Sequence, residues 1–182
     1  LGITDSTIHN MNPEELVAMV AAKVVENKWA LSNASTGTDY TDPNNALNQF
    51  VTYHIIPAKI EPNKLVIHFN ELWYNLSDKV KKASVYDFYT TMGKRRLLKT
   101  YEAAKTFDGK RNTIYLNRFP ILNNATDGDY TEVGCEDGKQ GVEIITEGNP
   151  ETYNGYIYRL NDVLYYNDNT VETMGKERIR ID

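Results

Sequence analysis

The residues best suited to catalysis in this sequence are one cysteine and three histidines. A catalytic thiol needs a base beside it, and the histidines all lie far from Cys135 in sequence: His9, His54 and His68. Acidic residues stand on both sides of the cysteine, and such neighbours raise the pKa of a thiol and oppose thiolate formation. A single cysteine also excludes an internal disulfide framework and a cysteine-based zinc cluster. We therefore expect no nucleophilic cysteine.

Motifs for other reactions are missing as well. The sequence has no Gly-x-Gly-x-x-Gly, no phosphate-binding loop, no serine nucleophile elbow and no His-Glu-x-x-His. One acidic segment does not match the EF-hand spacing and reads as an exposed loop; its carboxylates are Asp127, Asp129, Glu132, Glu136 and Asp137. We expect no enzyme activity, no cofactor and no metal. With 25 acidic residues in the chain, a hydrolase acting through paired carboxylates stays as a third alternative.

Tyrosine dominates the aromatic residues, with 13 Tyr beside 2 Trp and 5 Phe. A tyrosine ring combines an apolar face with a hydroxyl, which suits recognition surfaces, although tyrosine is also a good strand former. The aromatic candidates for stacking on sugars or contacting a partner protein are Trp29, Trp73, Tyr74 and Tyr165, with Tyr166 next to the last.

The net charge of -5 is unevenly distributed. Residues 1–78 carry 4 basic and 9 acidic side chains, residues 79–118 carry 11 and 3, and residues 127–151 carry 1 and 8. A basic patch suits a nucleic acid or an anionic glycan, but oppositely charged stretches also pair with each other or stay solvated. The basic residues include Lys79, Lys81, Lys82, Lys94, Arg95, Arg96, Lys99, Lys110 and Arg111. Because the sequence pI is about 5.3, we expect no nucleic-acid partner.

Two helices are predicted near the start of the chain. Asn12 and Pro13 suit a helix N-terminus, Glu15 completes a capping box, and Asn27 is the predicted end. Residues 32–45 read as a loop. A second helix is predicted from Asp42 and Pro43 to a point before Pro57, with His54 on its apolar face as a semi-buried residue that hydrogen-bonds the backbone.

Short runs of β-branched and aromatic residues follow Pro57. The predicted strands are Lys64 to Phe69, Arg95 to Glu102, Thr113 to Phe119, Gly141 to Thr146, Gly155 to Leu160 and Val163 to Tyr166, while Val85 to Thr91 suits either a helix or a strand. Helices first and strands later, without regular alternation, predict an α+β fold with a mainly antiparallel sheet.

Four segments resemble the motifs of fasciclin-like domains, in the order of that family. The first signature, a helix ending in Tyr-His before two aliphatic residues and Pro, resembles Asn48-Gln49-Phe50-Val51-Thr52-Tyr53-His54-Ile55-Ile56-Pro57, where Ala58 replaces the usual Gly. The family's Thr-Leu-x-Gly turn is similar to Thr91-Met92-Gly93, and its short strand ending in Val-Asn to Thr113-Ile114-Tyr115-Leu116-Asn117. The second signature resembles Asn154-Gly155-Tyr156-Ile157-Tyr158-Arg159-Leu160-Asn161-Asp162-Val163-Leu164, with Tyr158 in place of the usual His.

This resemblance implies a β-sheet wedge flanked by helices. It places a fasciclin-like domain at residues 1–166, without the family's opening strand and with inserts near 32–45, 76–90 and 127–152. Residues 167–182 resemble a connector to a following domain in surface lipoproteins of Bacteroidetes-type bacteria. Because the 182-residue chain begins with Leu1, we interpret it as an excerpt of a longer protein.

The resemblance also implies a function. Fasciclin-like domains act in adhesion at cell surfaces, and in animal relatives the Tyr-His pair, here Tyr53 and His54, is linked to receptor binding. We therefore expect a non-catalytic module on the cell surface or outer membrane that binds an extracellular protein or polysaccharide. Its other partners would be neighbouring domains of the same chain, and a lipid anchor outside the excerpt would be its only link to the membrane. The alternative is a glycan-capture module that serves polysaccharide uptake.

Overall fold

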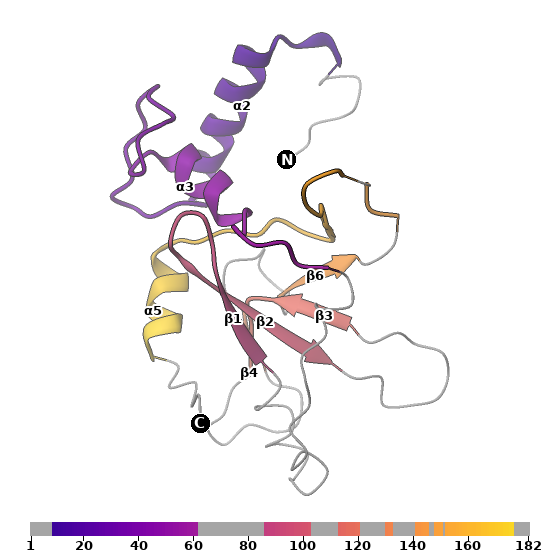
Figure 1. Cartoon of the computed structure of the whole chain (residues 1–182). Coiled ribbons are helices and arrows are strands. Elements are labelled where there is room, and N and C mark those ends of the chain that lie inside the picture. The colour runs from indigo at the N-terminus through magenta and orange to yellow at the C-terminus, as the bar shows by residue number, and fades with distance from the viewer. Residues whose placement is uncertain are drawn as a thin grey trace, which may run out of the picture. The chain divides into compact units, whose positions relative to one another are not determined.

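The computed structural model describes residues 9–61, 86–102, 113–120, 130–132, 141–145, 148–150 and 152–176 of the chain (Figure 1). The chain divides into two compact units. Unit 1 joins the two ends of the chain, Leu1–His54 and Tyr165–Asp182, and unit 2 is Ile55–Leu164. The expected boundary at residue 166 between a domain and a connector stays a prediction.

Helix α2 (Pro13–Glu26) begins where the sequence predicts. The side chain of Asn12 accepts a hydrogen bond from Glu15 N at 2.8 Å, and Asn12 N donates to Glu15 Oε2 at 3.3 Å. These two bonds satisfy backbone donors that have no partner inside the helix. The predicted capping box is therefore confirmed.

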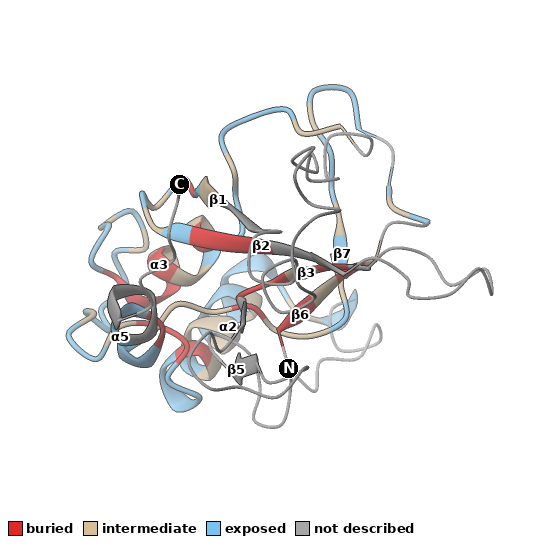
Figure 2. Cartoon of the chain, turned by 90° about the horizontal axis from the view of Figure 1, so that it is seen from below, coloured by how far each residue is buried: buried red, intermediate tan, exposed pale blue. Residues whose placement is uncertain are grey.

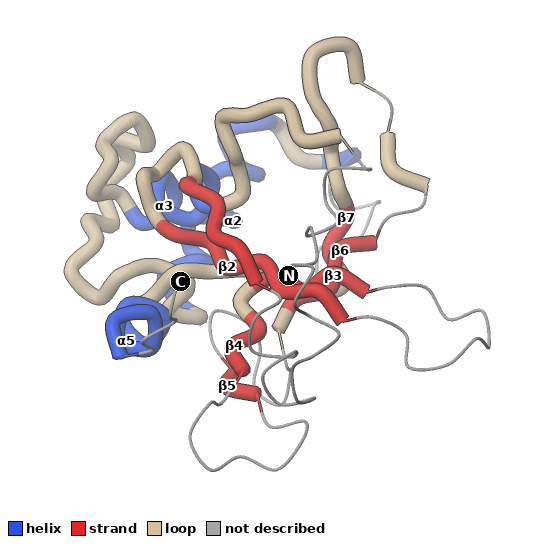
Figure 3. The backbone as a smooth tube through the Cα atoms, turned by 60° about the horizontal axis from the view of Figure 1, so that its bottom comes forward, coloured by secondary structure: helices blue, strands red, loops and turns tan. Residues whose placement is uncertain are grey.

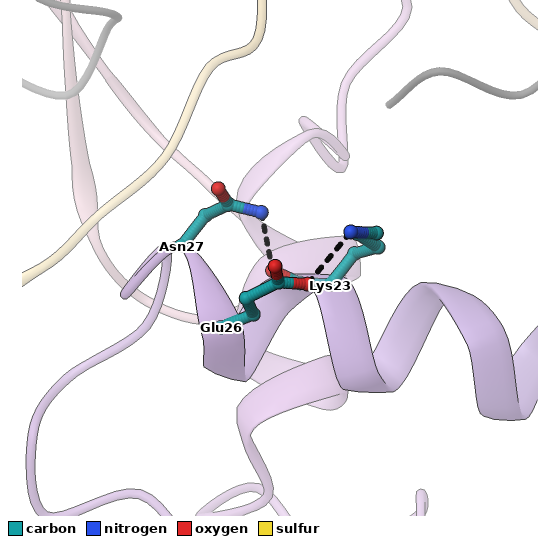
Figure 4. A network of polar contacts seen from close by, with 3 residues as sticks. All are labelled: Lys23, Glu26 and Asn27. Atoms are coloured by element: carbon teal, nitrogen blue, oxygen red, sulfur yellow. Dashed lines mark hydrogen bonds and ion pairs between the residues drawn. The ribbon is translucent and has the colours of Figure 1, made fainter.

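The other end of α2 is closed by side chains of its last turn (Figure 4). Asn27 is the C-cap, and its Nδ2 donates to Lys23 O at 2.9 Å. Lys23 Nζ also lies 2.7 Å from Glu26 Oε2. The ion pair is partly exposed and adds little stability. Because Asn27 is the C-cap of α2, the predicted stop at this residue is confirmed.

Helix α3 (Ala46–Tyr53) starts later than predicted. Asp42 was expected to begin the helix, but its Oδ1 accepts from Asn44 N at 2.9 Å and so closes a tight turn. Asn45 then serves as the N-cap, with Oδ1 accepting from Leu47 N at 2.9 Å. The loop thus uses Asp42 for a turn and the buried Asn45 for the cap.

Helix α5 (Asp168–Lys176) belongs to unit 1, although it lies near the other end of the chain. Asn167 Nδ2 donates to Lys28 O at 3.3 Å, and Ser32 N donates to Asp168 Oδ1 at 3.3 Å. These bonds tie the start of α5 to the loop that follows α2. The buried apolar side chains of unit 1 are Val24, Trp29, Ala30, Ala46, Leu47 and Tyr53.

An antiparallel sheet forms the centre of unit 2 (Figure 3). Its five strands lie in the order β1 (Tyr86–Thr90), β2 (Arg96–Glu102), β3 (Thr113–Leu116), β6 (Val142–Ile145) and β7 (Arg159–Leu160). A separate pair joins β4 (Arg118–Pro120) to β5 (Tyr130–Glu132). Helices together with an antiparallel sheet confirm the general α+β class.

Strand β2 is covered on both faces. Successive strand residues point to opposite sides of a sheet, and Leu97, Leu98 and Lys99 are 2%, 0% and 2% exposed. Figure 2 shows this buried stretch in red. Among the residues of unit 2 that the structure describes, the buried apolar side chains are Leu97, Leu98, Ile114, Leu116, Val142, Ile144 and Leu164.

In the middle of the sheet, the structure decides one open strand prediction and corrects another. The segment Val85 to Thr91, which suited either structure, contributes β1, because its residues pair with β2 from Tyr86↔Thr100 to Thr90↔Arg96. The single strand predicted from Thr113 to Phe119 is divided into β3 and β4. Asn117 has φ 53°, a left-handed conformation that a continuous strand does not allow, so the ladder ends there.

The strand predictions near the end of unit 2 are only partly correct. Of the predicted strand Gly155 to Leu160, only β7 pairs with β6. The side-chain amide of Asn149 ends this pairing, because its Oδ1 accepts from Arg159 N at 2.8 Å and its Nδ2 donates to Ile145 O at 2.7 Å. Val163 to Tyr166 forms no strand, since Val163 N donates to Asp162 Oδ1 at 2.7 Å instead of to a neighbouring strand. The predicted strand Lys64 to Phe69 lies outside the described residues. Within the described ranges, no helix has the length and apolar character needed to span a membrane.

Candidate functional site

Trp29 and Tyr165, two of the aromatic candidates, meet inside unit 1. The Trp29 ring stacks on Phe50 at 5.6 Å between centroids and on Tyr165 at 6.3 Å, with interplanar angles of 18° and 20°. Trp29 is 7% exposed. Its ring therefore contributes to the core of unit 1, and in this conformation it presents no free face on which a sugar could stack.

Tyr53 and His54, the pair singled out by the family resemblance, point to different surroundings. Tyr53 is fully buried, and its ring lies 5.1 Å from that of Tyr166. His54 is the C-cap of α3, where its Nδ1 lies 2.8 Å from Phe50 O and its ring lies 4.7 Å from the Phe50 ring. The predicted backbone hydrogen bond of His54 is confirmed, although the residue is exposed rather than semi-buried.

The surroundings of His54 lower its pKa below the ordinary value of 6.5. The main cause is the protein packed around the ring, which removes water from the charged form, and the hydrogen bond to the Phe50 carbonyl opposes the shift. Although part of the residue is exposed, the ring is therefore neutral at pH 7. A buried Tyr53 and a capping His54 thus both contribute to the fold of unit 1.

The remaining aromatic candidates, Trp73 and Tyr74, lie outside the described residues, as do Cys135 and most of the predicted acidic loop. Two of the described basic residues, Arg96 and Lys99, contact aromatic side chains of the β1–β2 hairpin. Lys99 Nζ donates to Tyr89 Oη at 2.6 Å, and the Arg96 guanidinium lies 3.8 Å from the centre of the Phe88 ring. In the described part of the chain, no group of three His, Cys, Asp or Glu residues is arranged to hold a metal ion.

A hollow of about 400 Å³ lies among the described residues of unit 1. Val24, Lys28 and Leu31 line one part, and the start of α5 lines another. The volume suits a small molecule. Its lining combines apolar side chains with polar residues of the loop after α2 and of the start of α5. Two of these polar groups already bond within unit 1, since Asp168 Oδ1 accepts from Ser32 N and Asn167 Nδ2 donates to Lys28 O.

Among the described residues of unit 2, the most exposed aromatic side chains lie just before β7. We call Tyr153, Tyr156, Ile157 and Tyr158, together with Lys59, the tyrosine surface. Tyr153 is 108% exposed, Ile157 53% and Tyr156 42%. Three large exposed side chains within five consecutive residues are typical of a contact surface.

Side-chain interactions hold the tyrosine surface in place. Tyr158 Oη donates to Ile60 O at 2.8 Å, which joins the stretch before β7 to the segment that precedes residue 62. Tyr156 stacks on Tyr158 at 6.2 Å and 22°, and Lys59 Nζ lies 5.7 Å from the centre of the Tyr156 ring. Tyr156 thus has a ring on one side and a cation near its centre, which fixes its orientation.

The hydroxyl of Tyr158 stays protonated well into the alkaline range. Partial burial raises its pKa above 10.0, and the nearby Tyr156 and Glu61 add to the effect. A protonated hydroxyl is required for the bond to Ile60 O, since a phenolate has no proton to donate. Burial therefore protects the contact that anchors this surface.

Sequence reasoning selected none of Tyr153, Tyr156 and Tyr158 as a candidate site residue. The first two flank Asn154-Gly155, a dipeptide typical of exposed turns, and Tyr158 follows two residues later. This local density of tyrosine around a turn was the signal that could have found the surface. The surface was not predicted because Gly155 to Leu160 was expected to be a strand, and tyrosine is common in strands without any functional role.

Comparisons with protein-family models, with curated proteins and with solved structures gave no match to this chain. The resemblance to fasciclin-like domains therefore stands on the motifs of the sequence alone.

Proposed function

We propose that this chain is a non-catalytic interaction module whose tyrosine surface binds an extracellular protein. The main support for this function is that Tyr153 and Ile157 are exposed on a segment anchored by the hydrogen bond from Tyr158 to Ile60 O. A contact surface gains affinity when its apolar groups are held in position before binding, because less entropy is lost on association. Tyrosine supplies a large contact area with few rotatable bonds.

A protein is favoured over a polysaccharide as the partner. A sugar ring stacks on an open aromatic face, but the Tyr156 ring lies against Tyr158 and near Lys59. Trp29, another sugar-stacking candidate, is enclosed by Phe50 and Tyr165. Tyr153 retains an open ring, which supports the glycan-capture module as the second candidate.

We also propose that the chain is a fasciclin-like domain and that it is located at the cell surface. The order of the four motifs supports the family, and the antiparallel sheet with helices is compatible with it. The location is supported only through the family resemblance. A lipid anchor and neighbouring domains in a longer chain would follow from it.

The test is a binding assay on immobilised extracellular-matrix proteins and cell-wall polysaccharides. We expect the wild-type protein to bind at least one protein, and the double variant Y153A/I157A to lose that binding. V51A is the matched control, because Val51 is 45% exposed and lies on α3 of unit 1. Binding to polysaccharides alone would favour the second candidate, and protein binding that Y153A/I157A leaves unchanged would refute the tyrosine surface as the contact site.

A further inference from the structure

Asn154 and Gly155 form the only Asn-Gly pair in the sequence, at the tip of the tyrosine surface. Asn154 is exposed, and within the described ranges its side chain has no hydrogen-bond partner. A Cβ placed on Gly155 would meet no atom within 4 Å, so the space around the peptide bond between the two residues is open. We propose that Asn154 is a site of spontaneous deamidation, in which a modification without any enzyme places a carboxylate on this surface.

The reaction needs only this dipeptide and water. The backbone nitrogen of Gly155 loses its proton to a base and attacks the side-chain carbonyl carbon of Asn154. A C–N bond forms, the amide nitrogen leaves as ammonia, and a cyclic succinimide results. Water then opens the ring at either carbonyl, which gives aspartate or isoaspartate. Glycine favours the attack because no side chain shields its nitrogen and its backbone rotates freely.

Asn149 shows by contrast why Asn154 is reactive. Both ends of the Asn149 amide are engaged, with Nδ2 bonded to Ile145 O at 2.7 Å and Oδ1 to Arg159 N at 2.8 Å. The next residue is Pro150, whose nitrogen carries no hydrogen and cannot form the succinimide. Asn154 has neither the side-chain bonds nor the proline, so the two residues differ in both requirements of the reaction.

The product would alter the tyrosine surface in two ways. Either form adds one negative charge between Tyr153 and Tyr156, close in sequence to the ring that Lys59 approaches at 5.7 Å. Isoaspartate also routes the main chain through the former side chain and adds one carbon to the backbone. That extra atom changes the turn in which Thr152 Oγ1 donates to Gly155 O. Deamidation of Asn154 does not depend on what the surface binds.

The experiment follows the intact folded protein during incubation at mildly alkaline pH, with a mildly acidic sample beside it. Trypsin releases residues 140–159 as one peptide, so fragmentation distinguishes Asn154 from the internal control Asn149. An isoaspartyl methyltransferase assay detects the isomerised product independently. We expect conversion at Asn154, with isoaspartate as the larger product and slower conversion in acid, while Asn149 stays an amide.

The matched variant is G155A, which keeps Asn154 and introduces a methyl group into open space. We expect it to convert at least about ten times more slowly, equivalent to about 1.4 kcal/mol in activation free energy. Circular dichroism confirms that the variant is folded; if it is not, the wild-type contrast between the two asparagines decides alone. An Asn154 that stays intact while a synthetic peptide of residues 150–158 deamidates would overturn the proposal, and so would a folded G155A that converts at the wild-type rate.

Discussion

Asn117 and Leu98 hydrogen-bond each other in both directions across the sheet of unit 2. Asn117 N donates to Leu98 O at 2.9 Å, and Leu98 N donates to Asn117 Oδ1 at 3.3 Å. Asn117 is 0% exposed and has φ 53°. Its side chain thus replaces a strand partner at the point where the left-handed conformation interrupts the ladder.

We predict that N117A lowers the free energy of unfolding by about 2–3 kcal/mol. The variant leaves the buried Leu98 N–H without its side-chain acceptor. It also places alanine at a positive φ, where asparagine is tolerated because its side chain can hydrogen-bond locally and the alanine methyl group cannot. N117G loses the same bond but tolerates the backbone angle, so we expect a smaller loss. Urea unfolding followed by circular dichroism measures both.

Asn161 provides the control for this prediction. It repeats the pattern with β6, since Asn161 N donates to Glu143 O at 3.1 Å and Glu143 N donates to Asn161 Oδ1 at 2.8 Å. Asn161 is exposed, so water can replace the lost acceptor and N161A is expected to cost only about 1 kcal/mol. Equal losses for N117A and N161A would show that burial is not what makes Asn117 important.

The second prediction concerns the core of unit 1. We expect W29A to destabilise the protein by about 3–5 kcal/mol, because it removes a buried indole and leaves a cavity between two rings. W29F, which keeps an aromatic ring between Phe50 and Tyr165, should cost less. Thermal and urea unfolding provide the comparison, with the exposed-site variant V51A as the control. If W29A were as stable as the wild-type protein, the stacking of Trp29 on Phe50 and Tyr165 would not be formed in solution.

Local signals in the sequence were sufficient for some elements of this fold. The start of α2 follows from Asn12, Pro13 and Glu15, whose capping interactions span only a few residues. Strand β2 matches the predicted segment Arg95 to Glu102, which combines leucine, threonine and tyrosine. The late start of α3 was missed because Asp42 and Asn45 are both good caps, and only the tertiary position of Asn45, buried at 2% exposure, decides between them.

The candidate site depends on long-range contacts that no local pattern reveals. Tyr158 reaches the carbonyl of Ile60 across 98 positions of the sequence, and this contact makes the segment before β7 a surface instead of a longer strand. Trp29 is one of the candidates for stacking on a sugar or a partner protein, and in the structure its ring stacks on that of Tyr165 from a distant part of the chain. Residue type alone does not distinguish a ligand-binding aromatic side chain from one buried by a distant segment.

The third prediction is a pH dependence of stability that originates at His54. Its pKa in the folded protein is lowered, whereas the unfolded chain has the ordinary value of 6.5. The unfolded state therefore binds more protons as the pH falls below that value, and the fold loses stability on acidification until the folded-state pKa is passed. NMR titration of the imidazole should show a midpoint below 6.5. A midpoint at or above it would contradict the assignment.

Substitution of His54 tests the same group by another route. We expect H54A to lower thermal stability at pH 7 through loss of the bond to Phe50 O and of the ring contact. The variant should also show a weaker loss of stability between pH 7 and pH 5 than the wild type. It should affect any partner binding less than it affects stability, and a variant of unchanged stability that no longer binds would reverse this view of His54.

The fourth prediction tests the anchor of the tyrosine surface. We expect Y158F to lower the free energy of unfolding by about 1 kcal/mol, because Ile60 O loses its hydrogen-bond donor. In the wild type, the raised pKa of Tyr158 means that the unfolded chain releases this proton first, so stability falls as the pH rises through and above 10.0. Y158F should weaken this alkaline loss and remove one late step from the phenolate absorbance titration. An unchanged titration would place the Tyr158 hydroxyl in water and remove the physical basis for an anchored surface.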